Sequence, residues 1–176
     1  TTYDTVMTDF IITSHRRSIR LPNYDYRQDG FYFVTLVSQQ RECLFDDPKV
    51  RQVAETLWQD LSDRFPYVSL DEWVLMPNHL HGILHFHHQE QADVAVHLPR
   101  ERPSGARSGS LGAVVGAYKS LSTRRINPIL GREDRGIWQR NYYEHVVRSD
   151  RELAAIRQYI RDNPENWALD EHYSHR

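Results

Sequence analysis

One nine-residue segment, residues 79–87, alternates between histidine and apolar side chains, and it constrains the fold more than any other part of the chain. Its histidines are His79, His81, His85 and His87, and Ile83 shares their parity. The opposite parity holds Leu80, Gly82, Leu84 and Phe86. Because successive side chains of a strand point to opposite faces, this segment predicts a β-strand. We expect its apolar face to be covered by helices and its histidine face to be open to solvent.

The order of the other periodic segments predicts an α+β fold. Dense β-branched and aromatic residues, or strict alternation, predict strands over residues 31–37, 68–76, 79–87 and 142–147. Apolar residues at helical spacing predict helices over residues 50–61, 110–126 and 153–160. The order β-α-β-β-α-β is that of a ferredoxin-like split βαβ unit, with a four-stranded antiparallel sheet and two helices on one face. The last helix is a C-terminal extension.

A chain of 176 residues is long enough for one domain with a buried core. We divide it into a basic N-terminal arm over residues 1–29, a domain over residues 30–149, and a C-terminal helix and tail over residues 150–176 that belong to the same domain. A single cysteine, Cys43, excludes a scaffold held by internal disulfides. No stretch has the length of a membrane span or the pattern of a signal peptide, so we expect a cytoplasmic protein.

The basic residues are unevenly distributed and almost all arginine. Of 22 basic residues only Lys49 and Lys119 are lysines, and guanidinium groups suit the bidentate recognition of phosphates. Residues 118–161 hold ten basic residues against five acidic ones, although the whole chain has a net charge of −2. This distribution indicates one basic surface on a nearly neutral molecule.

Histidines two residues apart on a strand can bind one divalent cation, and His79 and His81 have that spacing. The alternative for such a pair is a solvated strand. The helix predicted over residues 110–126 carries Tyr118, whose alternative interpretation is a core aromatic that continues the apolar stripe of Leu111, Val114 and Val115. Beside a metal-capable histidine pair in a basic segment, Tyr118 is our candidate nucleophile.

These residues resemble a known family. The run Val74–Ile83, with Pro77-Asn78-His79-Leu80-His81 at its centre, is similar to the HUH motif (histidine, hydrophobic residue, histidine) of single-tyrosine transposases. Gly116–Ser120 is similar to the nucleophile helix of that family, and Leu21-Pro22 with Phe31–Leu36 resembles its first strand. Ile137–His145 and Tyr159–Pro164 are similar to the REP-associated branch, whose members act on repetitive extragenic palindromes. The resemblance spans roughly residues 16 to 170.

The resemblance implies a metal-dependent single-strand DNA endonuclease and strand transferase that acts on such hairpins. It implies Mg²⁺ or Mn²⁺ held by His79 and His81, and attack by Tyr118 to give a covalent 5′-phosphotyrosine. A phenol of pKa about 10 needs a nearby cation to act as a nucleophile, which is consistent with this pairing. Some relatives place a glutamine one turn after the tyrosine as a third ligand, and Ser122 occupies that position here. The third ligand is therefore open between Ser122, Asn78, a water and a DNA oxygen.

His85 and His87 lie about 13–20 Å along the strand from His81, so we expect them to face DNA or solvent. The partner we expect is a single-stranded DNA hairpin, bound by a monomer or, as the alternative, a dimer, and no membrane. The basic residues expected to contact it are Arg16, Arg17, Arg20, Lys119, Arg124, Arg125 and Arg140.

Two other functions are consistent with part of this residue pattern. The first is a non-catalytic module that binds single strands on the open sheet, with Tyr32, Tyr142 and Tyr143 stacking on bases. The second is a histidine-rich metal-binding protein, for which the single cysteine and scattered histidines give no closed structural site. The histidine pair together with Tyr118 favours the nuclease.

Overall fold

The computed structural model describes residues 24–87, 108–133 and 135–167. The predictions for Arg16, Arg17 and Arg20 lie outside these residues. The described elements are β1 (Gly30–Val37), η1 (Gln39–Arg41), η2 (Leu44–Asp46), α2 (Pro48–Gln59), α3 (Leu61–Arg64), β2 (Val68–Leu75), β3 (His79–Phe86), α4 (Leu111–Ile126), β4 (Tyr143–Val147) and α5 (Asp150–Asp162).

The four strands form one antiparallel sheet in the order β2-β3-β1-β4. This order confirms the predicted ferredoxin-like arrangement, and β2 and β3 form a hairpin that is joined at Pro77-Asn78. The two central strands are β1 and β3. The histidine segment forms β3, and β1 pairs with it. Their register sets Thr35 opposite His81 and Val37 opposite His79.

Short polar residues start the three long helices, each within about three residues of the start predicted from the sequence. Asp47 Oδ1 accepts hydrogen bonds from the backbone N–H groups of Lys49 and Val50, and Pro48 occupies the first turn of α2. Ser110 caps α4 and Ser149 caps α5 through N–H groups three residues further on. Each cap satisfies backbone donors that a helix N-terminus leaves without an intrahelical partner.

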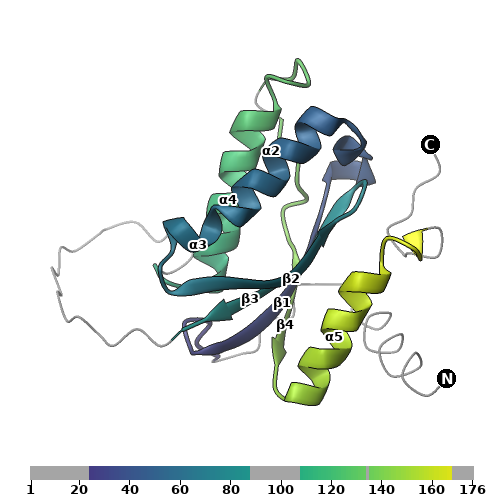
Figure 1. Cartoon of the computed structure of the whole chain (residues 1–176). Helices are drawn as coiled ribbons and strands as arrows, with labels where there is room; N and C mark the ends of the chain where they lie inside the picture. Colours follow the sequence, from purple (N-terminus) through teal and green to yellow (C-terminus); the bar gives the residue numbers. More distant parts are fainter. Residues whose placement is uncertain (1–23, 88–107, 134, 168–176) are drawn as a thin grey trace, which may run out of the picture.

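Helices α2 and α4 cover one face of the sheet, as Figure 1 shows. The core between them is aromatic, with Trp58, Tyr32, Tyr118 and Phe45 fully buried. Gly82 permits this packing, because a Cβ atom built on it would come within 2.5 Å of Trp58 Cζ2. The apolar parity of β3 thus faces the helices, as predicted.

Helix α5 covers the other face of the sheet, which the sequence analysis expected to be open (Figure 1). Its apolar stripe packs against Phe33 and Ile83 as a second buried cluster, made by Leu153, Ile156 and Ile160. Burial of three such side chains stabilises the helix by roughly 1.5–3 kcal/mol each. The expectation of a solvent-exposed histidine face is therefore wrong: an amphipathic helix must bury its apolar stripe, and this face was available for it.

Ion pairs fix α5 along the edge strand β2. Arg157 makes a bidentate pair with Asp71, with Nε 2.8 Å from Oδ1 and Nη2 2.6 Å from Oδ2. Arg161 pairs with Glu72 at 2.6 Å. Both acidic residues lie where the β2–β3 pairing shifts register between Leu70 and Trp73, so an irregularity of the edge strand presents its carboxylates to the helix.

Among the described residues, no helix has the length and apolar character needed to cross a membrane.

We expect Gly82→Ala to lower the free energy of unfolding by about 1–3 kcal/mol, because the added methyl overlaps Trp58 in a packed core. Gly116→Ala is the matched control, since Gly116 is an exposed position inside α4 with nothing within 4 Å of an added Cβ. That control should gain up to about 1 kcal/mol. Urea unfolding measures both, and equal stability of the two variants would contradict the packing described.

The pair between Asp71 and Arg157 should make the stability of the fold depend on pH. The hydrogen bond from Arg157 holds the pKa of Asp71 below its usual value of 3.8. A lowered carboxyl pKa stabilises the folded state above the unfolded pKa, and this stabilisation disappears as the pH falls through the folded value. Asp71→Asn should therefore lower stability by about 1–2 kcal/mol at pH 7. The difference from wild type should vanish in strong acid, as urea unfolding across a pH series would show.

Candidate functional site

His79 and His81 lie at the start of β3 with their rings together. The ring centroids are 4.5 Å apart, and both side chains are buried, with exposed fractions of 0% and 2%. Two imidazoles on one face of a strand, two residues apart, result from the period of the strand. The predicted pair is therefore brought together.

Each imidazole is held through its Nδ1 atom. His79 Nδ1 lies 2.8 Å from Asn78 Oδ1, and His81 Nδ1 lies 2.8 Å from Thr35 Oγ1. Thr35 is in reach because it lies directly opposite His81 in the β1–β3 register. Metal-binding histidines commonly have one ring nitrogen engaged by a neighbour, which orients the other towards the metal.

A tyrosine from α5 completes this cluster. The Tyr159 hydroxyl lies 3.2 Å from His81 Nε2, and the two rings are 5.2 Å apart. Tyr159 also packs edge-on against Phe33 at 6.3 Å. Its position follows from the apolar stripe of α5, because Tyr159 lies beside Ile156 and Ile160 on the part of the helix that faces the sheet.

Tyr118 lies on the opposite side of the sheet from the histidines. Its hydroxyl donates to the Ala54 carbonyl at 3.2 Å, and its ring packs edge-on against Trp58. The side chain is fully buried, and burial raises its pKa well above the usual value for tyrosine. The prediction that Tyr118 lies beside the histidine pair is therefore corrected. Its helical spacing with Val114 and Val115 reflects a place in the core, which was the alternative interpretation.

Ser122, one of the candidate third ligands, lies with Tyr118. Its hydroxyl donates to the Tyr118 carbonyl at 2.7 Å and accepts from Trp138 Nε1 at 2.8 Å, so it is part of the α4 core. Asn78 lies at the site, but its Oδ1 atom is engaged by His79. Among the described residues no group of three His, Cys, Asp or Glu side chains could hold a metal ion.

The donor set therefore fits a cation bound by two imidazoles, with its remaining positions taken by water and by oxygens of a substrate. Such an arrangement is open, whereas a structural metal site is closed by four protein ligands. A cation whose other ligands are phosphate oxygens is the usual arrangement for Mg²⁺ and Mn²⁺ at sites that act on phosphate esters.

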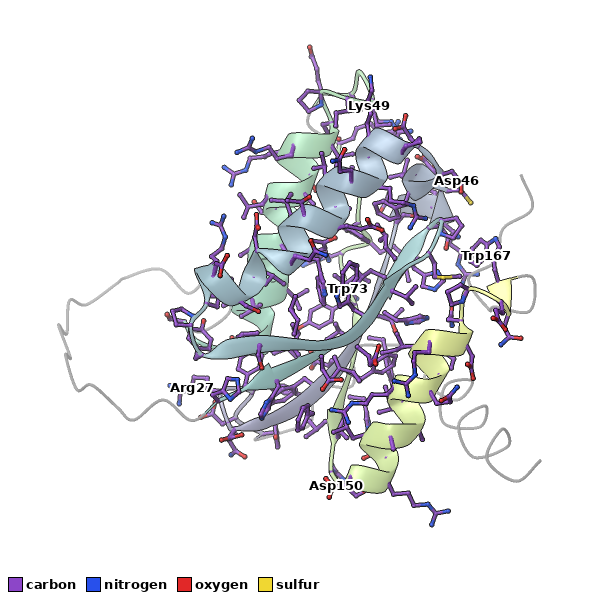
Figure 2. The ribbon with its side chains drawn as sticks, in the orientation of Figure 1. Arg27, Asp46, Lys49, Trp73, Asp150 and Trp167 are labelled. Atoms are coloured by element: carbon purple, nitrogen blue, oxygen red, sulfur yellow. The ribbon has the colours of Figure 1, made fainter. Side chains whose placement is uncertain are left out.

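The segment that follows α5 borders the site. Trp167 lies beyond the C-terminal end of that helix, where Figure 2 labels it, and its ring is 5.8 Å from that of His79. The site is thus lined by the start of β3, the end of α5 and this aromatic side chain.

The predicted DNA-contacting residues fall into two groups. Arg124, Arg125 and Arg140 are exposed, the first two near the end of α4 and the third in the segment before β4. Lys119 is half-buried, and its Nζ donates to the carbonyls of Gln139 and Arg140 at 2.6 and 2.9 Å. Burial lowers the pKa of Lys119 to about 8. Lys119 thus fastens this segment to α4, which departs from the expected phosphate contact.

His85 and His87 form a separate group at the far end of β3. Their rings are 4.2 Å apart, and His85 stacks on Phe31 at 4.0 Å. His87 Nε2 is bonded to Ser69 Oγ at 2.9 Å. They are therefore distant from the histidine pair, as the strand spacing predicts.

The open aromatic platform expected for a single-strand binding module is not formed by the three tyrosines considered. Tyr32 is fully buried on the α2 and α4 side. Tyr143 packs against Phe33 beneath α5, at 6.0 Å between the ring centroids, and Tyr142 is half-buried against the core on the other side. A sheet with both faces covered offers no open surface of this kind.

Tyr159 and Thr35 contact His81 but were not among the site residues predicted from the sequence. A usable signal was present in both cases. The stripe of Leu153, Ile156 and Ile160 requires a partner surface, and the histidine face was the sheet face left to cover it. For Thr35, the antiparallel pairing of β1 with β3 would have placed a hydroxyl beside His81.

No family model matches the sequence. An "Uncharacterized protein" of Haemophilus influenzae is 37% identical over 175 residues, which cover 90% of this chain and 93% of that protein. A "Putative REP-associated tyrosine transposase" of the same organism is 24% identical over 152 residues, which cover 82% of this chain and 76% of that protein.

A solved structure of a REP-associated tyrosine transposase bound to a REP hairpin has the same fold, with a TM-score of 0.53 and 18% identity over 82% of this chain and 72% of that chain. The identity of 37% over nearly the whole length of both proteins shows that this chain and the first relative belong to one family. The second relative is similar over most of both chains and is named a putative REP-associated tyrosine transposase. The chain belongs to the family of REP-associated tyrosine transposases.

Proposed function

We propose that this protein is a metal-dependent transposase that cleaves and rejoins single-stranded DNA at REP-like hairpins, with Tyr159 as its nucleophile. The observation that carries the proposal is the contact between the Tyr159 hydroxyl and His81 Nε2 at 3.2 Å, beside the ring of His79. A tyrosine and two imidazoles so placed can act on one phosphate group. The related protein solved in complex with a REP hairpin supports the choice of substrate.

In the proposed cleavage step the Tyr159 hydroxyl oxygen attacks the scissile phosphorus in line with the 3′-oxygen. The new bond joins phosphorus to the tyrosine oxygen, and the bond from phosphorus to the 3′-oxygen breaks. The phenol proton is released through solvent, and the departing 3′-oxygen gains a proton to become a hydroxyl. The number of phosphoester bonds is unchanged, so attack by another 3′-hydroxyl reverses the step and joins strands without an external energy source.

His79 and His81 would hold the Mg²⁺ or Mn²⁺ ion, through their Nε2 atoms. When bound, the ion supplies positive charge that polarises the scissile phosphate and favours the phenolate over the phenol. Thr35 and Asn78 hold the two imidazole rings at their Nδ1 atoms, and α5, which packs on the same face of the sheet, places the Tyr159 hydroxyl beside His81 Nε2. Binding of the reacting groups in a fixed geometry is a large part of such catalysis.

The residues of the site all come from one copy of the chain, since β3 and α5 supply both histidines and the tyrosine. The expected monomer stays a prediction. Arg140 is exposed on the segment that pairs with the end of β1, where Val37 lies opposite His79, and this supports a contact between Arg140 and the DNA backbone.

Tyr159→Phe should abolish the formation of a covalent protein–DNA adduct, because it removes only the attacking oxygen. The assay incubates the protein with a labelled REP-like hairpin and Mn²⁺ and resolves the adduct on a denaturing gel. Tyr118→Phe is the matched control, a buried tyrosine that loses one hydrogen bond. It should keep the adduct and lose about 0.5–1.5 kcal/mol of stability. An adduct that persists in Tyr159→Phe and disappears in Tyr118→Phe would return the role to Tyr118.

His79→Ala and His81→Ala should each remove metal-dependent cleavage, whereas His85→Ala and His87→Ala should leave it. The reason is their placement, since the second pair lies at the far end of β3 against Phe31 and Ser69. Adduct yield against Mn²⁺ concentration measures the effect. Equal loss in all four variants would contradict a site confined to the first pair.

A further inference from the structure

Asn78 is a fully buried amide between the strained turn of η1 and the first metal-candidate histidine. Its exposed fraction is 0%, and its Nδ2 donates to the Arg41 carbonyl at 3.1 Å. Its Oδ1 lies 2.8 Å from His79 Nδ1. The NH₂ group and the oxygen of the amide therefore each make a hydrogen bond, the first with Arg41 and the second with His79.

These partners determine the orientation of the amide. A backbone carbonyl can only accept, so the NH₂ group of Asn78 must face Arg41 and its oxygen must face His79. Because that oxygen can also only accept, the hydrogen of the neutral His79 ring must lie on Nδ1. The lone pair is then on Nε2, which is the atom required to bind a cation.

The backbone that supplies the Arg41 carbonyl is strained. Gln40 and Arg41 have φ values of 57° and 56°, in the left-handed region that side chains other than glycine rarely adopt. The turn is held against the start of β3 by the hydrogen bond from Ser38 N to the Asn78 carbonyl, at 2.8 Å. Such strain persists where surrounding contacts impose it, and it often marks functional sites.

We propose that Asn78, oriented by the strained turn over residues 38–42, is a positioning residue that selects the Nδ1–H tautomer of His79. The selected tautomer presents Nε2 to the cation, and this consequence rests on the function proposed above. The assignment of the tautomer itself does not depend on that function. Asn78 does not itself bind the metal, and this excludes one of the candidate third ligands.

The experiment compares wild type with Asn78→Leu, which removes both hydrogen-bonding groups at similar volume, and Asn78→Asp, which keeps the acceptor. Asn127→Leu is the matched control: Asn127 is also buried and also donates to a backbone carbonyl, that of Arg135 at 2.9 Å, but on the α4 side of the sheet. The tautomer of His79 is measured by ¹⁵N NMR of the neutral ring without metal, and Mn²⁺ affinity by calorimetry.

Wild type and Asn78→Asp should show hydrogen on Nδ1, and Asn78→Leu should shift His79 towards the Nε2–H form. Asn78→Leu should also weaken Mn²⁺ binding by about 10–100-fold, the usual effect of removing a partner of a metal ligand. The His81 ring should be unchanged in every variant. Asn127→Leu should lose stability but keep both the tautomer and the affinity.

A wild-type His79 with hydrogen on Nε2, or a tautomer unchanged in Asn78→Leu, would overturn the proposal. Should the leucine variant not fold, the wild-type and aspartate measurements still decide, because hydrogen on Nε2 in either one contradicts the assignment. Wild type that binds no Mn²⁺ while the tautomer responds to Asn78→Leu supports the positioning role and contradicts the proposed metal site. The two proposals therefore fail in different measurements.

Discussion

The packing of α5 on the histidine face of the sheet is the interaction on which the candidate site depends. Leu153, Ile156 and Ile160 pack with Phe33 and Ile83, and this apolar contact brings Tyr159 to the histidines. The same contact removes the imidazoles from bulk water, which strengthens any electrostatic interaction made there. The Arg157–Asp71 and Arg161–Glu72 pairs then set the position of the helix along the edge strand.

The two faces of the sheet have separate tasks. The face towards α2 and α4 holds the large aromatic core, with Trp58 against Gly82 and Tyr118 against Trp58. The apolar cluster on the face towards α5 is smaller, and this face also carries the histidine pair with its hydrogen-bond partners. A strand with period two separates these tasks residue by residue, because successive side chains of β3 point to opposite faces of the sheet.

The fold could be predicted from the sequence because its signals are local. Alternation over residues 79–87 predicts β3, and helical spacing predicts α4 over residues 110–126, which the structure confirms. The closing helix was predicted over residues 153–160 and begins earlier, at Asp150. The histidine pair is local as well. The tyrosine beside the histidines could not be identified in this way, since its identity depends on which face of the sheet each helix covers. Tyr118 and Tyr159 both follow an apolar stripe, and only the packing shows that the first meets Ala54 and the second His81.

The reactive groups are far apart in the chain, although they lie side by side in the fold. Tyr159 follows His81 by 78 residues and belongs to the final described helix, so both histidines are synthesised well before their tyrosine. A domain generally folds as a unit, so contacts between such distant segments form only when the whole domain is present. A nascent chain that lacks α5 therefore carries both histidines of the candidate site without Tyr159. The candidate site is thus complete only in a copy whose final described helix has been made and has packed on the sheet.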